Sequence, residues 1–229
     1  MARLRRIELT DWPYMVVLRA QEGQALVRDD EDRQHLLDIL RDASREHGLA
    51  IHAYSLLDDH LHLLATPQQQ DALSLCLQAL GRRYVAGFNR RHQRQGGLWA
   101  GRYRATIIDP ARHLLNCMIF IELHAQRNHA SHRAEDYHWS SLAHHLGRRT
   151  DPLVTDHVLF WSLGNTPFER QANWRRRLED GLPVATIRQL ADATHKGWAL
   201  AEAATLARLQ DLTSRPLQPR PRGRPRKQH

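Results

Sequence analysis

The spacing of hydrophobic and polar residues changes several times along the first 130 positions, and each change predicts a new element. Segments rich in β-branched, aromatic or alternating apolar residues predict strands at 13–20, 50–57, 60–66 and within 98–109. Apolar residues at three- and four-residue spacing predict helices at 29–47, 71–93 and from 110 to about 128. Asp58 and Asp59 separate two of the strands, which predicts a β-hairpin.

The predicted order is strand, helix, strand, strand, helix, strand, helix. A ferredoxin-like antiparallel sheet with helices packed against it would bury the apolar residues of all these elements, so we predict an α+β domain over residues 1–150. Helical spacing then dominates at 166–181, 185–193 and 201–212, which predicts a helical C-terminal extension over 151–213. Residues 214–229 are rich in Pro and Arg, have no apolar face, and are expected to be disordered when free.

The composition favours a polyanionic partner. The formal net charge is +8, and arginine, whose guanidinium matches phosphate oxygens, dominates the basic residues. A basic protein without such a partner is the alternative. No apolar run approaches the roughly 20 residues of a membrane span, so no membrane association is expected. Cys76 and Cys117 form no C-x-x-C pair, which fits a reducing cytoplasm.

A histidine pair stands in the third predicted strand. His60 and His62 point to one face of the sheet and Leu61 to the other, so two imidazoles lie side by side and can chelate one divalent ion. His124, on the predicted helix face that also carries Phe120, is a candidate third ligand if that helix crosses the histidine face. The alternative is a set of structural histidines that hold no ion, with His124 favoured by the helix dipole.

Several blocks of the chain, in order, resemble the HUH-type single-tyrosine transposases of bacterial insertion sequences, including those associated with repetitive extragenic palindromes (REPs). The segment 59–64 (DHLHLL) is similar to their N-H-V-H-L-L core. Further similar blocks are 79–84 (ALGRRY), 88–91 (FNRR), 98–104 (LWAGRYR), 136–141 (DYHWSS), 194–200 (THKGWAL) and 222–227 (RGRPRK). The resemblance therefore extends over nearly the whole chain.

The resemblance implies a ferredoxin-like fold and DNA, single-stranded or in a hairpin, as the partner. It also implies Mg²⁺ or Mn²⁺ held by His60, His62 and a polar residue of the last helix of the domain, here His124, whose imidazole also suits Zn²⁺. In the family a helix tyrosine attacks the scissile phosphate and forms a covalent phosphotyrosine bond. Oligomeric state is left open between monomer and homodimer.

The chain departs from the family at this tyrosine. The family's Y-I-E-L-N-P-V-R-A corresponds to 120–128 (FIELHAQRN), so Phe120 occupies the nucleophile position and cannot form the covalent bond. We favour a transposase-family protein that still binds DNA but has lost tyrosine-mediated cleavage. The main alternative is a non-enzymatic DNA-binding regulator derived from a transposase. The others are a substitute tyrosine, Tyr103 or Tyr137, for which packing roles are the better interpretation, and a nuclease that uses a metal-bound water.

Basic and aromatic residues predict the DNA-contacting surfaces. The C-terminal half of the second helix and the segment after it can follow a phosphate backbone, with Trp99 or Tyr103 stacking on unpaired bases. The arginines concerned are Arg82, Arg83, Arg90, Arg91, Arg102 and Arg104. In the tail, Arg224 stands within an AT-hook-like Gly-Arg-Pro flanked by Arg222 and Arg226, which predicts contact with A/T-rich duplex DNA. A solvated basic face and a solubilising tail are the alternatives.

Overall fold

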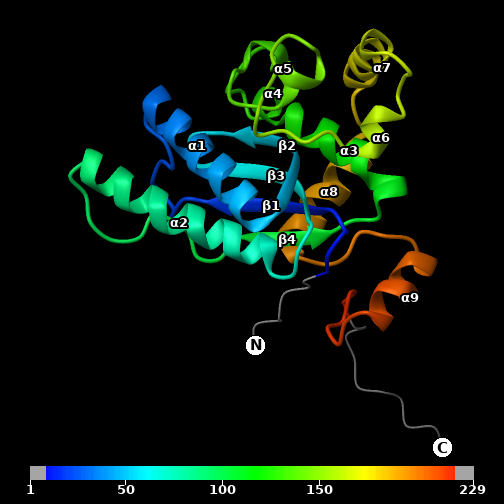
Figure 1. The fold of residues 1–229 in the computed structure, drawn as a ribbon, viewed down its shortest axis with the longest axis horizontal. Coiled ribbons are helices and arrows are strands. Elements are labelled where there is room, and N and C mark those ends of the chain that lie inside the picture. Colours follow the sequence, from blue (N-terminus) through cyan, green and yellow to red (C-terminus); the bar gives the residue numbers. More distant parts are fainter. Residues whose placement is uncertain (1–8, 220–229) are drawn as a thin grey trace, which may run out of the picture.

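In the computed structural model, which describes residues 9–219, four strands form one antiparallel sheet (Figure 1). The strands are β1 (Tyr14–Arg19), β2 (Leu49–Leu56), β3 (His60–Pro67) and β4 (Arg104–Ile107). Their spatial order is β2-β3-β1-β4, and β1 pairs antiparallel with both β3 and β4. This is the ferredoxin-like arrangement, so the predicted fold class is confirmed.

Two helices, α1 (Asp30–His47) and α2 (Ala72–Arg91), cover one face of the sheet, and α3 (Pro110–Glu122) covers the other. The ends of these helices follow from local chemistry. The side chain of Asp29 accepts a hydrogen bond from the backbone N–H of Asp32 at the start of α1, and Gly48 ends that helix at a φ of 66°. Asp109 caps α3, and Pro110 begins it.

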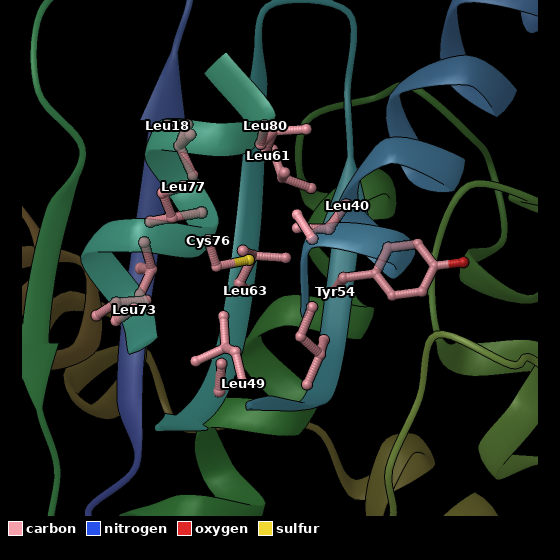
Figure 2. Close-up of a cluster of buried hydrophobic side chains, with 14 of the residues drawn as sticks. Leu18, Leu40, Leu49, Tyr54, Leu61, Leu63, Leu73, Cys76, Leu77 and Leu80 are labelled. Atoms are coloured by element: carbon pink, nitrogen blue, oxygen red, sulfur yellow. The ribbon is translucent and has the colours of Figure 1, made fainter. Parts of the chain in front are cut away.

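The core on the α1 and α2 side is built from alternate residues of the strands. Figure 2 shows Leu18, Leu61 and Leu63 of the sheet beside Leu77 of α2 and Leu40 of α1. All five side chains are at most 5% exposed. Because strand residues alternate between faces, burying Leu61 and Leu63 here directs the side chains of β3 between and before them to the α3 side.

The second core lies on the α3 side and includes the C-terminal extension. Trp174 of α7 (Pro167–Asp180) and Leu190 of α8 (Val184–Lys196) are fully buried in the same cluster as Met118 of α3. The remaining elements are α4 (His124–Arg127), the 3-10 helix η1 (Ala134–Asp136), α5 (Leu142–His145), α6 (Val158–Trp161) and α9 (Ala203–Asp211). The extension therefore covers part of the ferredoxin-like unit.

The helices expected in the extension are present as α7, α8 and α9. The helix expected from 110 to about 128 is instead broken at Leu123, between α3 and α4. The side chain of Arg127, rather than the next helical N–H, donates a hydrogen bond to the carbonyl of Phe120. Elements of three or four residues, such as η1, α5 and α6, are too short to produce a periodic signal. Over residues 9–219 no helix is both long and apolar enough to cross the membrane.

Candidate metal centre and nucleic-acid interface

Three histidines meet where β3 faces the junction of α3 and α4. The candidate ligand atoms of His60, His62 and His124 all lie within 4.8 Å of one another. Their ring centroids are separated by 5.2 Å between His60 and His62, 4.8 Å between His60 and His124, and 4.4 Å between His62 and His124. The structure thus brings together the three residues expected as ligands, and we call them the histidine centre.

The hydrogen bonds of His60 orient its ring toward the centre. Its Nδ1 lies 2.5 Å from a carboxylate oxygen of Asp59, and because a carboxylate accepts, Nδ1 carries the hydrogen. The Nε2 of neutral His60 then presents a lone pair, 2.5 Å from Nε2 of His124. At this distance one hydrogen lies between the two nitrogens, and a shared divalent ion would hold them farther apart. A carboxylate behind a histidine in this way is a common outer partner of metal ligands.

Burial keeps the three imidazoles neutral. His60 and His62 are 5% exposed and His124 is 9% exposed. Burial lowers the pKa of His60, lowers that of His62 well below its usual value, and lowers that of His124 to about 3. Neutral imidazole is the form that binds a metal ion, so the environment favours the ligand state near neutral pH.

His62 provides the test of whether these residues fit a metal ion. Both of its ring nitrogens are buried and have no hydrogen-bond partner among the described residues. A buried polar atom without a hydrogen-bond partner lowers the stability of the fold. A cation bound by the lone pair of one His62 nitrogen would offset part of that loss. With nitrogen donors from three neutral histidines, the set suits borderline ions such as Zn²⁺ as well as Mn²⁺.

Phe120 lies beside the histidine centre. Its ring is 4% exposed, and its centroid is 6.0 Å from those of both His62 and His124. The guanidinium carbon of Arg127 lies 4.4 Å from the same centroid. The position that the sequence resemblance assigns to the nucleophile is therefore adjacent to the candidate ligands, and here it carries a hydrocarbon ring.

Comparisons with known proteins identify the family of this chain. The family described as "Transposase IS200 like" matches residues 9–123, half of the chain. The chain belongs to the IS200-like transposase family. Membership gives this family member a DNA-binding, transposase-like role, and the histidine centre is compatible with a divalent metal. The match includes His60, His62 and Phe120 and ends one residue before His124.

Two solved structures match this family member in the structural comparison. The structure of a REP-associated tyrosine transposase bound to a REP hairpin has a TM-score of 0.57 at 15% identity, covering 69% of this chain and 92% of that one. It shows the shared fold. A proposed transposase from Deinococcus radiodurans R1 is 28% identical over 51% of this chain and 92% of its own, with a TM-score of 0.35, too low to indicate a common architecture. The comparison with curated proteins gave no match.

A buried network that sequence reasoning missed begins two residues before His124. Glu122, two residues before His124, is fully buried. One of its carboxylate oxygens accepts hydrogen bonds from Ser141 at 2.6 Å and from Nδ1 of His145 at 2.5 Å. The other accepts one from the indole nitrogen of Trp174 at 3.0 Å. We call these four residues the Glu122 network, and it joins α3 to the C-terminal extension.

The network continues to a second histidine cluster, His144, His145 and Asp156. Burial alone would lower the pKa of His145, but the carboxylates of Glu122 and Asp156 raise it to about 9. The backbone N–H of Asp151 donates to Nδ1 of His144 at 3.1 Å, so neutral His144 carries its hydrogen on Nε2, toward Asp156. That hydrogen occupies the nitrogen a metal would need, and the cluster is better described as a buried charge network.

The arginines expected to contact DNA differ in their surroundings. Arg91 is ion-paired with three acidic residues at the start of α1, Asp29, Glu31 and Asp32. Arg83 is 2.6 Å from Glu46, and Arg104 donates to the carbonyl of His195 at 2.7 Å. These pairings arise where α2 packs against α1 and where β4 meets α8. Arg82, Arg90 and Arg102 are exposed and have no ion-pair partner among residues 9–219.

A cavity of about 600 Å³ brings four of the expected DNA-contacting residues together. It lies between α2 and the segment before β4, and its lining includes Arg82, Trp99, Arg102 and Tyr103 with leucines of α2. Trp99 packs closely on the helix, since a Cβ at Gly81 would lie 3.3 Å from its indole nitrogen. This cavity belongs to the α1 and α2 side, opposite the histidine centre.

The two tyrosines considered as substitute nucleophiles lie elsewhere. Tyr103 packs against the core on the α1 and α2 side, whereas Phe120 belongs to the core on the α3 side. The hydroxyl of Tyr137 donates to the carbonyl of Leu56 at 2.5 Å, and burial raises its pKa to about 12. Both positions fit the packing interpretation. The tail arginines Arg222, Arg224 and Arg226, and most of the segment expected to be disordered, lie outside the described residues.

Proposed function

We propose that this family member binds single-stranded or hairpin DNA at a divalent-metal centre formed by His60, His62 and His124, without tyrosine-mediated strand cleavage. The observation that carries the proposal is the position of Phe120, whose ring centroid is 6.0 Å from those of two of the three histidines. A nucleophile is expected there, and phenylalanine has no hydroxyl with which to attack phosphorus.

A divalent ion, when bound, would polarise a phosphate ester. The protein side chains do the rest. His60 is oriented by Asp59, and His62 has two buried ring nitrogens with no other partner in the described chain. The neutral state of all three rings leaves lone pairs for the ion. Loss of a nucleophile usually lowers the rate of the chemical step by orders of magnitude, so we expect DNA binding to be retained when cleavage is lost.

The cavity lined by Arg82, Trp99, Arg102 and Tyr103 is the second part of the proposal. Aromatic rings offer stacking surfaces to unpaired bases, and the exposed guanidinium groups offer contacts to phosphates. We assign Arg90 to the same surface and give Arg83, Arg91 and Arg104 smaller contributions, because each already has a protein partner. The fold of this chain is similar to that of a transposase solved with a bound REP hairpin, which supports hairpin DNA as the partner.

The experiment uses a labelled single-stranded stem-loop, the full-length chain and Mn²⁺, analysed on native and denaturing gels. We expect a shifted complex on the native gel and no covalent band on the denaturing gel. Phe120→Tyr should gain a covalent protein–DNA band, and Phe120→Leu serves as the matched control without a hydroxyl.

Three results would count against the proposal. A covalent band with the wild-type protein would show that another residue attacks. Shortened DNA without a covalent band would indicate hydrolysis by a metal-bound water. A Phe120→Tyr protein that binds Mn²⁺ and DNA but forms no adduct would contradict the assignment of the nucleophile position.

A further inference from the structure

Arg127 is a partly buried cation at the edge of the histidine centre. It lies in α4, three residues after His124, and its Nη2 is 3.4 Å from Nδ1 of His124. The guanidinium stacks over Phe120 at 4.4 Å from the ring centroid, and Nη2 also donates to the carbonyl of that residue. Among residues 9–219 no carboxylate lies at ion-pair distance from it.

An unpaired cation in this position is unfavourable on its own. A guanidinium stays charged at neutral pH. Asp59, the carboxylate that contacts His60 of the centre, already accepts from that residue and lies 3.9 Å from Arg19. A divalent ion held by the histidines would increase the local positive charge further. Among residues 9–219 no carboxylate pairs with Arg127, so a bound anionic ligand would balance this charge.

We propose that Arg127 binds a phosphate oxygen of the DNA strand held at the histidine centre, a proposal that rests on the proposed DNA-binding function. The guanidinium offers a planar set of donors that matches phosphate. One donor is occupied by the Phe120 carbonyl, while Nε and Nη1 have no protein partner in the described chain and are not enclosed. Stacking on Phe120 fixes the plane of the guanidinium, and so fixes the plane in which Nε and Nη1 donate.

Capping the end of α3 is the competing explanation of Arg127, and two variants separate it from phosphate binding. Arg127→Gln retains a polar amide group but removes the charge. Arg127→Lys retains the charge but removes the planar donor set. Arg133→Gln is the matched control, since Arg133 is 70% exposed and lies six residues further along the chain.

The first measurement is the affinity for a labelled single-stranded oligonucleotide in Mn²⁺ at several salt concentrations. Arg127→Gln is expected to bind about tenfold more weakly, with a salt slope smaller by about 0.7, the change for one phosphate contact on a single strand. Arg127→Lys should be intermediate and Arg133→Gln unchanged. The proposal would be overturned if Arg127→Gln bound the oligonucleotide with the same affinity and salt slope as the wild type. It would also be overturned if urea titrations showed that the weaker binding of Arg127→Gln reflects a smaller fraction of folded protein.

The second measurement uses inorganic phosphate alone, without DNA or metal, and follows phosphorus resonance broadening. We expect broadening with the wild type and Arg133→Gln, and a reduced effect with Arg127→Gln. If phosphate binding depends on Arg127 but the wild type does not bind the oligonucleotide, the DNA-binding function is wrong and the anion site stands. If the oligonucleotide binds and neither measurement depends on Arg127, the anion site is wrong and the function stands.

Discussion

Trp174 donates a 3.0 Å hydrogen bond to Glu122, a residue 52 positions earlier that directly precedes the turn carrying His124. Both side chains are fully buried. The indole belongs to the C-terminal extension, and the carboxylate belongs to the last turn of α3. The extension therefore helps to fix the end of the helix from which the third candidate ligand follows.

Replacing Trp174 by phenylalanine tests this coupling. One oxygen of Glu122 loses its donor, and we expect this to cost about 1–3 kcal/mol in the free energy of unfolding, with a further cost from the cavity that the smaller ring leaves. Urea titration at pH 7 measures it. Trp161→Phe is the control, because Trp161 is 54% exposed and should change stability by less than about 0.5 kcal/mol. Equal effects of the two variants would contradict a specific role for the Glu122 hydrogen bond.

The pH dependence of stability should report on His145. Its pKa in the folded state is raised to about 9, so its contribution is complete below about pH 6.5, the value expected when unfolded, and is lost as pH rises through about 9. The stability difference between wild type and His145→Gln should therefore shrink between pH 6.5 and 9.5. Urea titrations across this range provide the measurement.

His52→Gln is a matched control for that titration. His52 is also buried, but burial lowers its pKa to about 4, so it stays neutral at every pH from 6.5 upward. The stability difference between wild type and His52→Gln should be constant over the alkaline range. It should change only as pH falls below about 6.5, where the unfolded chain binds a proton at His52 and the folded chain does not. A His145→Gln difference that is equally flat would mean that His145 is neutral and the charge network is misassigned.

Local rules predicted the fold and the histidine pair because both depend on short-range patterns. Alternation along β3 places His60 and His62 opposite Leu61, and the helix and strand order specifies the sheet. The partners of Glu122 could not be predicted, since Trp174 is distant in sequence and no periodic signal links them. The same limit applies to Arg91, which looked available for DNA until α1 was placed beside α2 with its acidic first turn.

Asp59 should affect metal affinity through His60. Removing its carboxylate in Asp59→Ala frees the Nδ1 hydrogen of His60, so the ring loses its orientation, and we expect Mn²⁺ or Zn²⁺ to bind about 10–100-fold more weakly. Asp59→Asn keeps an acceptor oxygen and should be intermediate. Calorimetric titration of the metal-free protein is the measurement.

The adjacent residue supplies the control for that titration. Asp58 forms an ion pair with Arg33 on α1 and makes no contact with the histidine centre. Asp58→Ala should leave metal affinity unchanged. Equal weakening by Asp58→Ala and Asp59→Ala would point to a general disturbance of the hairpin, and unchanged affinity in Asp59→Ala would show that His60 does not depend on this carboxylate.

Arg82 and Arg83 are consecutive residues of α2 with different electrostatic surroundings, which makes them a matched pair. Arg82 lines the 600 Å³ cavity and has no ion-pair partner in the described part of the chain, whereas Arg83 is held by Glu46. If the cavity contacts a DNA phosphate, Arg82→Gln should lower affinity for a stem-loop and reduce the salt slope by about 0.7–0.9. Arg83→Gln should change either quantity much less, because its charge is already partly neutralised. Fluorescence anisotropy at several salt concentrations measures both the affinity and the salt slope. Identical slopes for the two variants would mean that Arg82 makes no specific phosphate contact and that this surface contributes only diffuse positive charge.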